Sequence, residues 1–418
     1  MFALVKQIMN PKNKDIKQRV LFTLGVLFIF ELGTVIPIPG TENIVKDLGF
    51  LELFNAMGGG ALKNFSIFAL GVFPYISASI IMQLLQMDVI PYFTELGKQG
   101  HVGKQKLNKI TRYFGITIAF LQGYVFSIAF LPQNLLAIEY MRVAVILTAG
   151  TALLLWLGDQ ITQKGIGNGL SLIIMAGILS TIPMMFVNAY QEIVDFTSTQ
   201  TTFISLIGFL IFVLVYLIIV IGIIYIQQAE RRIPIQYANR TTTAYGAKQT
   251  YMPVKLNSAG VIPVIFASMA IAVPATIAQF VNNEKMTLFI EKYISYDTIT
   301  GFAFYVLLIV FFAYFYTFLQ LKPDKLANDL QQSGGYIPGI RPGGETTKYI
   351  SQILSRLTLV GAVFLIVIAG LPIIFSNVSN LSSNITIGGT GLLIVVGVLL
   401  ETYNQLEGKL LTRNYKVR

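Results

Sequence analysis

The chain has 418 residues, of which 54% are hydrophobic and 12% are charged, and its formal net charge is +10. A charged fraction about half that of an ordinary soluble domain cannot cover the surface of such a chain in water. The basic residues lie between apolar runs without any nucleic-acid recognition motif, so they indicate membrane topology and not nucleic-acid binding. The absence of cysteine excludes disulfides, thiolate metal sites and cysteine nucleophiles.

Ten apolar segments follow one another along the chain, and a spanning helix needs about 20 mainly apolar residues. In order, the segments are Val20–Ile36, Phe65–Leu85, Tyr113–Leu131, Met141–Leu157, Leu170–Val187, Phe203–Ile226, Ala259–Phe280, Phe302–Leu321, Leu357–Phe375 and Gly388–Leu400. The sequence therefore predicts an all-α polytopic membrane protein with ten transmembrane helices. No cleavage site of small residues follows the first apolar stretch, so we expect a retained span and a mature chain that starts at Met1.

The second segment is interrupted near Gly71 and Pro74, which predicts a broken helix. Broken helices at membrane depth need a cavity lined by protein or water to satisfy their free backbone groups. Just before it, Phe50–Phe73 begins amphipathically and passes through three glycines, Gly58 to Gly60. A short glycine-hinged helix cannot span a membrane, so it lies at the interface or folds back into a cavity, and the residues alone leave both possibilities open.

Ten spans place both chain ends on one side of the membrane. If the termini and the even-numbered loops are cytoplasmic, 25 of the 30 Lys and Arg residues lie on that side. The positive-inside rule therefore predicts cytoplasmic termini. Two halves of five spans each, 1–188 and 203–418, would meet at an external hinge loop, 189–202. Because five is odd, we expect the halves to be inserted in opposite orientations.

Two predicted cytoplasmic loops, 227–258 and 322–353, are longer than a helix connection requires. Both combine basic residues with aromatic and aliphatic ones, including Tyr251, Tyr336 and Ile337. This composition favours protrusions that dock a cytoplasmic partner, and solvated charge that only sets topology is the alternative.

Sets of residues typical of enzymes are missing from the sequence. The single histidine, His101, lies in a basic loop, so it offers neither a catalytic triad nor a histidine metal site. The glycines of Lys164–Ser171 match no phosphate-binding spacing and predict a tight turn before the fifth span. The apolar segments contain almost no charged residues, and Glu31 is the clearest of the few. This near absence of charge argues against a transporter coupled to ions or protons.

Long motifs then carry a family resemblance over nearly the whole chain. They are GGGALKNFSIFALGVFPYISASIIMQLL at 58–85, GDQITQKGIGNGLSLIIMAGI at 158–178, QAERRIPIQYANR at 228–240, NSAGVIPVIFASMAIAVPATIAQF at 257–280, GGYIPGIRPGGETTKYI at 334–350 and GGTGLLIVVGVLLE at 388–401. In this order and at these spacings the chain resembles the SecY family, the pore subunits of the bacterial protein-export channel. The resemblance implies two pseudo-symmetric inverted halves of five helices around a central pore.

The resemblance also implies a re-entrant plug helix at about 53–65, which would block the resting channel from its outer cavity. The plug residues would be Leu53, Phe54, Asn55, Met57, Gly58, Gly59, Gly60 and Phe65. A pore ring would be formed by Val72, Ile76, Leu170, Ile174, Ile265 and Ile394. Each of these aliphatic residues alone is more simply a core or lipid-facing residue. Branched aliphatic chains suit a gasket that deforms around a passing polypeptide and dewets when empty.

In the family, a lateral gate opens between the second and seventh spans. The corresponding positions are Ser77, Gln83, Gln122, Asn257, Met269 and Val273, and helix packing is the simpler explanation for the polar ones. Partner-binding arginines of the two loops would be Arg231, Arg232, Arg240 and Arg341. Basic loops suit the motor ATPase SecA and ribosomal RNA equally.

The resemblance thus implies a passive protein-conducting channel in the bacterial cytoplasmic membrane, with no cofactor, no metal and no catalytic residue. It would translocate unfolded preproteins and insert membrane proteins laterally. Its partners would be signal sequences, SecE-like and SecG-like small subunits, lipid, and SecA or the ribosome. Composition alone would favour a small-solute transporter, and a membrane-embedded enzyme is the third alternative.

Overall fold

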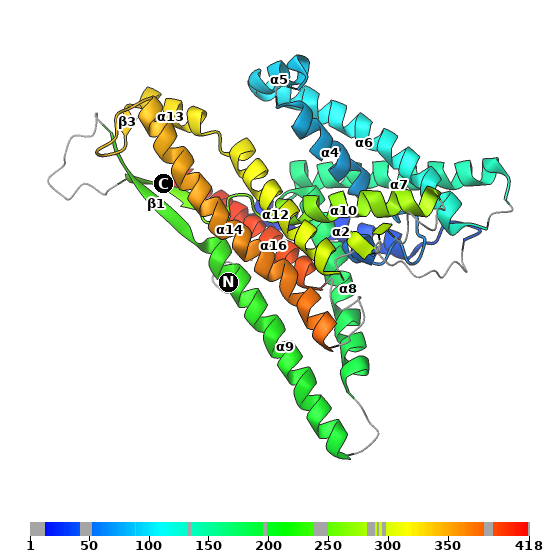
Figure 1. Ribbon diagram of the computed structural model, residues 1–418. Helices are drawn as coiled ribbons and strands as arrows, with labels where there is room; N and C mark the ends of the chain where they lie inside the picture. Colours follow the sequence, from blue (N-terminus) through cyan, green and yellow to red (C-terminus); the bar gives the residue numbers. More distant parts are fainter. Residues whose placement is uncertain are drawn as a thin grey trace. The chain divides into compact units, whose positions relative to one another are not determined.

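The structure, a computed structural model, describes residues 13–41, 52–87, 89–132, 135–194, 199–237, 250–281, 289–290, 292–294, 298–379 and 388–416. Helices dominate this part of the chain (Figure 1). The long helices are α2 (Lys14–Val35), α4 (Phe73–Leu85), α6 (Gly100–Phe130), α7 (Ala137–Lys164), α8 (Gly169–Ile193), α9 (Thr199–Gln228), α10 (Ile262–Val281), α12 (Ile299–Gln320), α14 (Gly344–Ser379) and α16 (Gly388–Lys416). Shorter helices are α3 (Glu52–Met57), α5 (Pro91–Lys98) and α13 (Pro323–Gln332).

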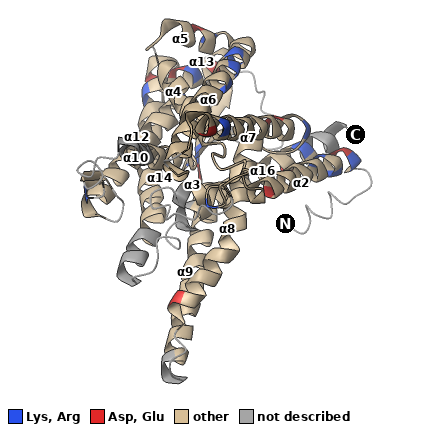
Figure 2. Ribbon diagram, turned by 90° about the vertical axis from the view of Figure 1, so that its right-hand side faces the viewer, with Lys and Arg blue, Asp and Glu red and all other residues tan. Residues whose placement is uncertain are grey.

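Each of the ten predicted apolar segments overlaps one of these ten helices, and the first eight residues of the second segment precede α4. Among the residues that the structure describes, seven helical stretches are long and apolar enough to cross a membrane, and α4 and the start of α10 are shorter apolar helices. Several helices extend beyond their apolar run. For example, α6 begins 13 residues before Tyr113, so His101 lies in a helical turn and not in an irregular loop. Lys and Arg residues gather near α5 and the first turns of α6 (Figure 2).

The predicted interruption of the second apolar segment is confirmed. Residues 58–72 form a series of turns, and α4 begins only at Phe73. Pro74 fits the first turn of α4 because a proline there lacks only an N–H that has no helical partner. Gly71, just before the helix, has a positive φ of 56°, a conformation that glycine adopts without steric cost.

The chain divides into two compact units. The first contains Met1–Glu192, Ala275–Thr287 and Ser383–Arg418, and the second contains Ile193–Pro274 and Leu288–Ser382. The division after Glu192 falls within the predicted hinge loop, 189–202. The last helix, α16, belongs to the first unit, so its contacts do not follow its place in the sequence. The division into inverted halves of five spans stays a prediction.

The second unit contains a small folded module that was not anticipated from the sequence. Strands β1 (Glu230–Tyr237), β2 (Thr250–Lys255) and β3 (Gly335–Tyr336) form an antiparallel sheet in the order β2-β1-β3. The sheet and α13 lie together at the start of α14 (Figure 1). The two long predicted loops therefore fold as one module, which we call the loop module.

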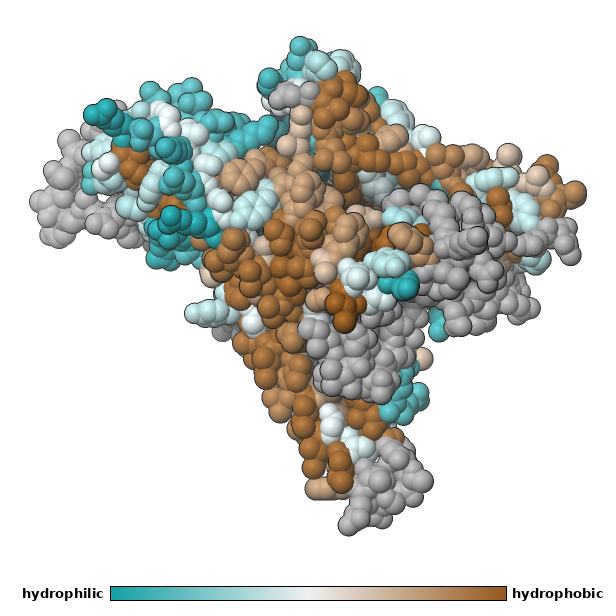
Figure 3. All heavy atoms as spheres, in the orientation of Figure 1, coloured by the Kyte–Doolittle hydropathy of each residue, from teal (hydrophilic) through white to brown (hydrophobic). Residues whose placement is uncertain are grey.

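The loop module has its own apolar core. Along β1, Ile233 and Ile235 alternate with exposed residues and point to the buried side of the sheet. They pack with Leu330 of α13 and Ile350 of α14. Pro234 is tolerated because β3 pairs with β1 only from Gln236 onward, which leaves one edge of the strand free at the proline. In Figure 3 the hydrophilic surface of the loop module contrasts with the apolar surface of α9.

Candidate functional site

The predicted plug begins with α3 and a glycine hinge. The α3 carbonyl oxygens of Phe54 and Asn55 accept hydrogen bonds from the backbone N–H groups of Gly58 and Gly60, at 2.9 and 2.8 Å. The Asn55 side chain closes the hinge, since its Oδ1 accepts from the Lys63 N–H at 2.8 Å. Gly59 and Gly60 have φ values of 72° and 79°, which explains why the hinge needs glycine. The side chain of Leu53 lies outside the described residues.

After the hinge, the chain packs deep inside the first unit. Phe65 is 1% exposed, and its ring centroid lies 5.4 Å from that of Phe130 at the end of α6. The Phe65 carbonyl accepts from the Ile38 N–H at 3.1 Å, and the Ile67 N–H donates to Ile36 O at 3.1 Å. These bonds give hydrogen-bond partners to backbone groups of a non-helical segment, which such groups need at membrane depth because lipid offers none. The segment is folded back against its own unit.

The glycine hinge contacts two long helices. A Cβ atom added at Gly59 would lie 3.1 Å from Ser180 Oγ and 3.3 Å from Gly177 Cα, both on α8, and 3.5 Å from Thr34 Cγ2 on α2. Asn64 adds a second link to α2, since its Nδ2 donates to Thr34 O at 3.4 Å. The predicted plug therefore rests between α2 and α8.

Five of the six predicted ring residues lie in the first unit. Val72 precedes α4 and Ile76 follows one turn later, with Val72 3% exposed. Leu170 and Ile174 are four residues apart on α8 and share one face. Ile394 lies on α16 and is 3% exposed. Ile265, on α10, belongs to the second unit, so closure of the ring stays a prediction.

The predicted gate residues also divide between the units. In the first unit, Ser77 and Gln83 lie on α4 and Gln122 lies on α6. Gln83 Nε2 donates to Ser79 Oγ at 3.2 Å, and its Oε1 is buried with no hydrogen-bond partner in the described part of the chain.

In the second unit, Asn257 is 7% exposed and donates to Gly260 O at 3.0 Å, just before α10. Met269 of α10 is also buried. The side chain of Val273 lies outside the described residues. The seam between the two sets stays a prediction.

Three of the four predicted partner-binding arginines lie on the loop module, and all three are exposed. Arg231 and Arg232 are on β1. Arg232 Nε donates to Glu230 Oε1 at 2.9 Å, and its guanidinium lies 4.7 Å from the ring centroid of Tyr251. Arg341 is held by its backbone, because its carbonyl accepts from Thr346 Oγ1 at 2.9 Å. Arg240 lies outside the described residues.

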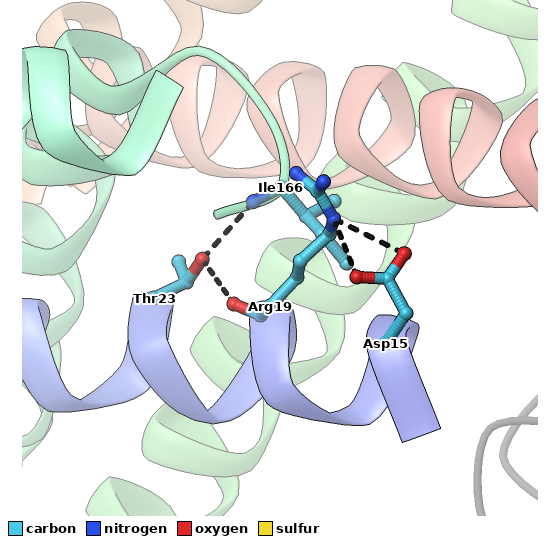
Figure 4. Close-up of polar contacts among 4 residues, drawn as sticks. All are labelled: Asp15, Arg19, Thr23 and Ile166. Atoms are coloured by element: carbon cyan, nitrogen blue, oxygen red, sulfur yellow. Dashed lines mark hydrogen bonds and ion pairs between the residues drawn. The ribbon is translucent and has the colours of Figure 1, made fainter. Parts of the chain in front are cut away.

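The predicted tight turn before the fifth span is confirmed between α7 and α8, and a threonine on α2 holds it. Thr23 Oγ1 accepts from the buried Ile166 N–H at 3.1 Å and donates to Arg19 O at 2.9 Å (Figure 4). Gly165 has no room for a side chain, because an added Cβ would collide with Thr23 Oγ1. The turn is thereby attached to α2.

One ion pair was missed by the sequence reasoning. Arg112 of α6 contacts Asp159 of α7 through Nη2 and Oδ2. The sequence shows Asp159 in the motif that begins GDQ at 158, but one sequence does not reveal which cation pairs with it, and Arg112 lies 47 residues earlier. Among the described residues, no group of three His, Asp or Glu side chains lies together to hold a metal ion.

Comparison with known proteins now adds a family assignment. The family model described as SecY matches residues 66–403. A protein translocase subunit SecY from Staphylococcus carnosus (strain TM300) is 46% identical over 97% of this chain and 97% of its own length. The corresponding subunit from Staphylococcus aureus (strain NCTC 8325 / PS 47) is 45% identical, with the same coverage. The chain belongs to the SecY family.

Solved structures agree with the SecY fold. The structure titled "The structure of a protein conducting channel" matches with a TM-score of 0.65 at 19% identity, covering 94% of this chain and 92% of the other. Sec61 in a canine ribosome-channel complex matches with a TM-score of 0.63 at 19% identity, over 94% and 92% of the two chains. At such identities the likeness establishes the fold, and it supports an all-α multi-pass membrane protein of the SecY type.

Proposed function

We propose that this chain is the central subunit of a protein-conducting channel. It lets unfolded secretory proteins cross the membrane passively and releases hydrophobic segments sideways into lipid. The single observation that carries this proposal is the 46% identity to a protein translocase subunit over 97% of the chain.

The plug assignment is supported by how the segment folds. A stretch of turns at 58–72 would be costly in lipid, yet its backbone bonds to Ile36 and Ile38, just after α2, and its apolar side chains pack on α6 and α7. Phe54 links the short helix to the predicted ring, because its ring centroid lies 4.4 Å from that of Phe73, next to Val72. The segment thus has a stable resting place beside the predicted pore ring.

The ring assignment rests on residue type and position. Val72, Leu170 and their partners carry aliphatic side chains that offer no hydrogen bond to a passing polypeptide. Such a constriction binds a translocating chain weakly and dewets when it is empty, which limits ion flow. The gate assignment rests on uncharged polar residues, whose contacts in a membrane are worth about 1 kcal/mol each and can be parted by a hydrophobic signal sequence.

The loop module is proposed as the docking surface for a cytoplasmic motor, SecA, or for a translating ribosome. Exposed Arg231, Arg232 and Arg341 on a rigid sheet and turn suit either carboxylates or RNA phosphates. Two related structures, a canine Sec61 and a yeast Ssh1 complex, come from ribosome-bound channels. Small SecE-like and SecG-like subunits would complete the assembly in the bacterial cytoplasmic membrane, with both chain ends in the cytoplasm.

Reconstitution tests the function directly. The chain, purified with its small subunits, is placed in vesicles with SecA, ATP and an unfolded preprotein. We expect protease-protected preprotein to accumulate inside the vesicles only when the chain, SecA and ATP are all present. Vesicles with the small subunits alone serve as the control. Equal protection in those vesicles, or none with the complete set, would overturn the proposal.

A further inference from the structure

Gly177 of α8 lies in close contact with the predicted plug. A Cβ added at Gly177 would collide with Met57 O and lie 2.9 Å from the Gly59 backbone nitrogen. The backbone of the glycine hinge therefore lies directly on the backbone of α8. In membrane proteins, small residues allow such close approach between segments.

The same short stretch of α8 carries two other contacts. Ile174, a predicted ring residue, precedes Gly177 by three positions, so the two share one helix face. Ile178 is 3% exposed, and its Cγ2 would lie 2.9 Å from a Cβ added at Gly391 of α16. Gly391 lies three residues before Ile394, another predicted ring residue. Residues 174–178, about one turn of α8, thus contact the predicted plug, include the ring residue Ile174 and touch α16 close to the ring residue Ile394.

Polar contacts tie this turn of α8 to α2. Ser180 Oγ donates to Gly177 O at 2.8 Å within α8, and the Glu31 carboxyl group of α2 lies beside Ser180. Thr34 Oγ1 donates to Glu31 O at 2.7 Å, and the same threonine contacts the hinge at Gly59. Glu31 of α2 therefore lies beside the site where the hinge rests.

We propose that Gly177 is the seat of the plug and that it couples plug release to widening of the ring through α8. The inference rests on the proposed channel function and deepens it. Because residues 174 to 178 belong to one continuous helix, an outward shift of Ile174 also carries Gly177 away from the hinge. Conversely, a seated plug resists widening of the ring. Ser180 and Glu31 are positioning residues that hold the seat against α2.

Gly177→Ala tests the seat. Alanine favours helix more than glycine does, so α8 itself is not weakened, and only the contact with the hinge suffers. We expect the resting ion conductance of single channels in planar bilayers to rise about tenfold, equivalent to about 1.4 kcal/mol, which is a typical effect of overpacking. Gly25→Ala is the matched control, because a Cβ at Gly25 of α2 meets nothing within 4 Å.

A second experiment tests the coupling. Ile174→Ala and Gly177→Ala are measured singly and together in the same conductance assay. We expect the double variant to leak less than the product of the two single effects, because both changes release the same element. A strictly multiplicative result would overturn the coupling, and a Gly177→Ala leak equal to that of Gly25→Ala would overturn the seat.

The channel function is judged separately. If the unmodified chain translocates preprotein and Gly177→Ala leaves conductance unchanged, the seat is wrong while the channel stands. If the unmodified chain translocates nothing, the proposed function itself fails. Thermal unfolding of each purified variant in detergent verifies that the measured channels are folded.

Discussion

Individual aliphatic residues carry most of the proposed function, and their sequence context alone does not reveal it. Val72 and Ile394 are as buried as ordinary core residues. What distinguishes them is their place: Val72 lies where an irregular segment meets α4, and Ile394 lies one turn from the contact between α16 and α8. The proposed role of these side chains depends on their shape and on how poorly they are hydrated.

Replacing Ile76 with asparagine tests the pore ring. A polar side chain at the constriction would hold water, so we expect a higher resting ion conductance or export of preproteins with defective signal sequences. Both are measured in reconstituted vesicles. Ile81→Asn is the control on the same helix, since Ile81 is 38% exposed. Equal behaviour of the two variants would count against the ring.

Reversing the charge of Arg341 tests the docking surface. We expect Arg341→Glu to reduce SecA-driven export at least severalfold, because a buried or partly buried charge pair with a partner becomes a repulsion. Membrane insertion of the channel itself should be unchanged. Lys348→Glu, an exposed cation on α14 of the same module, is the control. Normal export by Arg341→Glu would reject the proposed role.

At the scale of elements, the α7–α8 turn helps to hold the helices of the first unit together. The α7–α8 turn lies against α2 through Thr23, and its Ile166 side chain packs with Ile16 of α2 and Leu406 of α16. Because Leu170 and Ile174 follow this turn within two helical turns, its attachment also fixes where part of the predicted ring lies.

Thr23→Val tests that attachment. Valine keeps the shape of threonine but leaves the buried Ile166 N–H without an acceptor, which costs about 1–3 kcal/mol. We expect a lower melting temperature in detergent. Thr23→Ser retains the hydroxyl and should restore most of the loss. If valine and serine variants melt alike, the hydrogen bond drawn in Figure 4 contributes nothing to stability.

The loop module is the clearest case of an element assembled from distant sequence. Tyr336 Oη donates to Gln236 Oε1 at 3.0 Å, although 100 positions separate the two residues. Ile337, predicted to be part of a protrusion that docks a partner, is 2% exposed and belongs to the module's own core. The exposed arginines therefore lie on a folded module with its own core, not on isolated loops.

At the scale of the whole molecule, the proposed transport requires the plug to leave its resting place. A disulfide between residue 59 and residue 180 would prevent this. The distance of 3.1 Å from an added Cβ at Gly59 to Ser180 Oγ is within the reach of a disulfide, and the chain has no native cysteine to interfere.

We expect Gly59→Cys with Ser180→Cys to export normally when reduced and to stop exporting when oxidised. The single variants are the controls for export. Thermal unfolding of Gly59→Cys alone measures the cost of a side chain at positive φ, which we expect to be about 1–2 kcal/mol. Undiminished export by a fully crosslinked double variant would show that the segment does not have to move.

The sequence by itself determined the membrane class, the ten helices, the interruption before α4 and the SecY motifs. The membrane class, the helices and the interruption depend on local composition and period, which one sequence records directly. The motifs carry a resemblance to a known family. Only the tertiary structure decided where the interrupted segment rests, that Gly59 meets Gly177, and that two long loops form one sheet. Those contacts join residues that lie apart in the sequence, up to 118 positions for Gly59 and Gly177. A single sequence shows the glycines, but only the fold shows what each glycine touches.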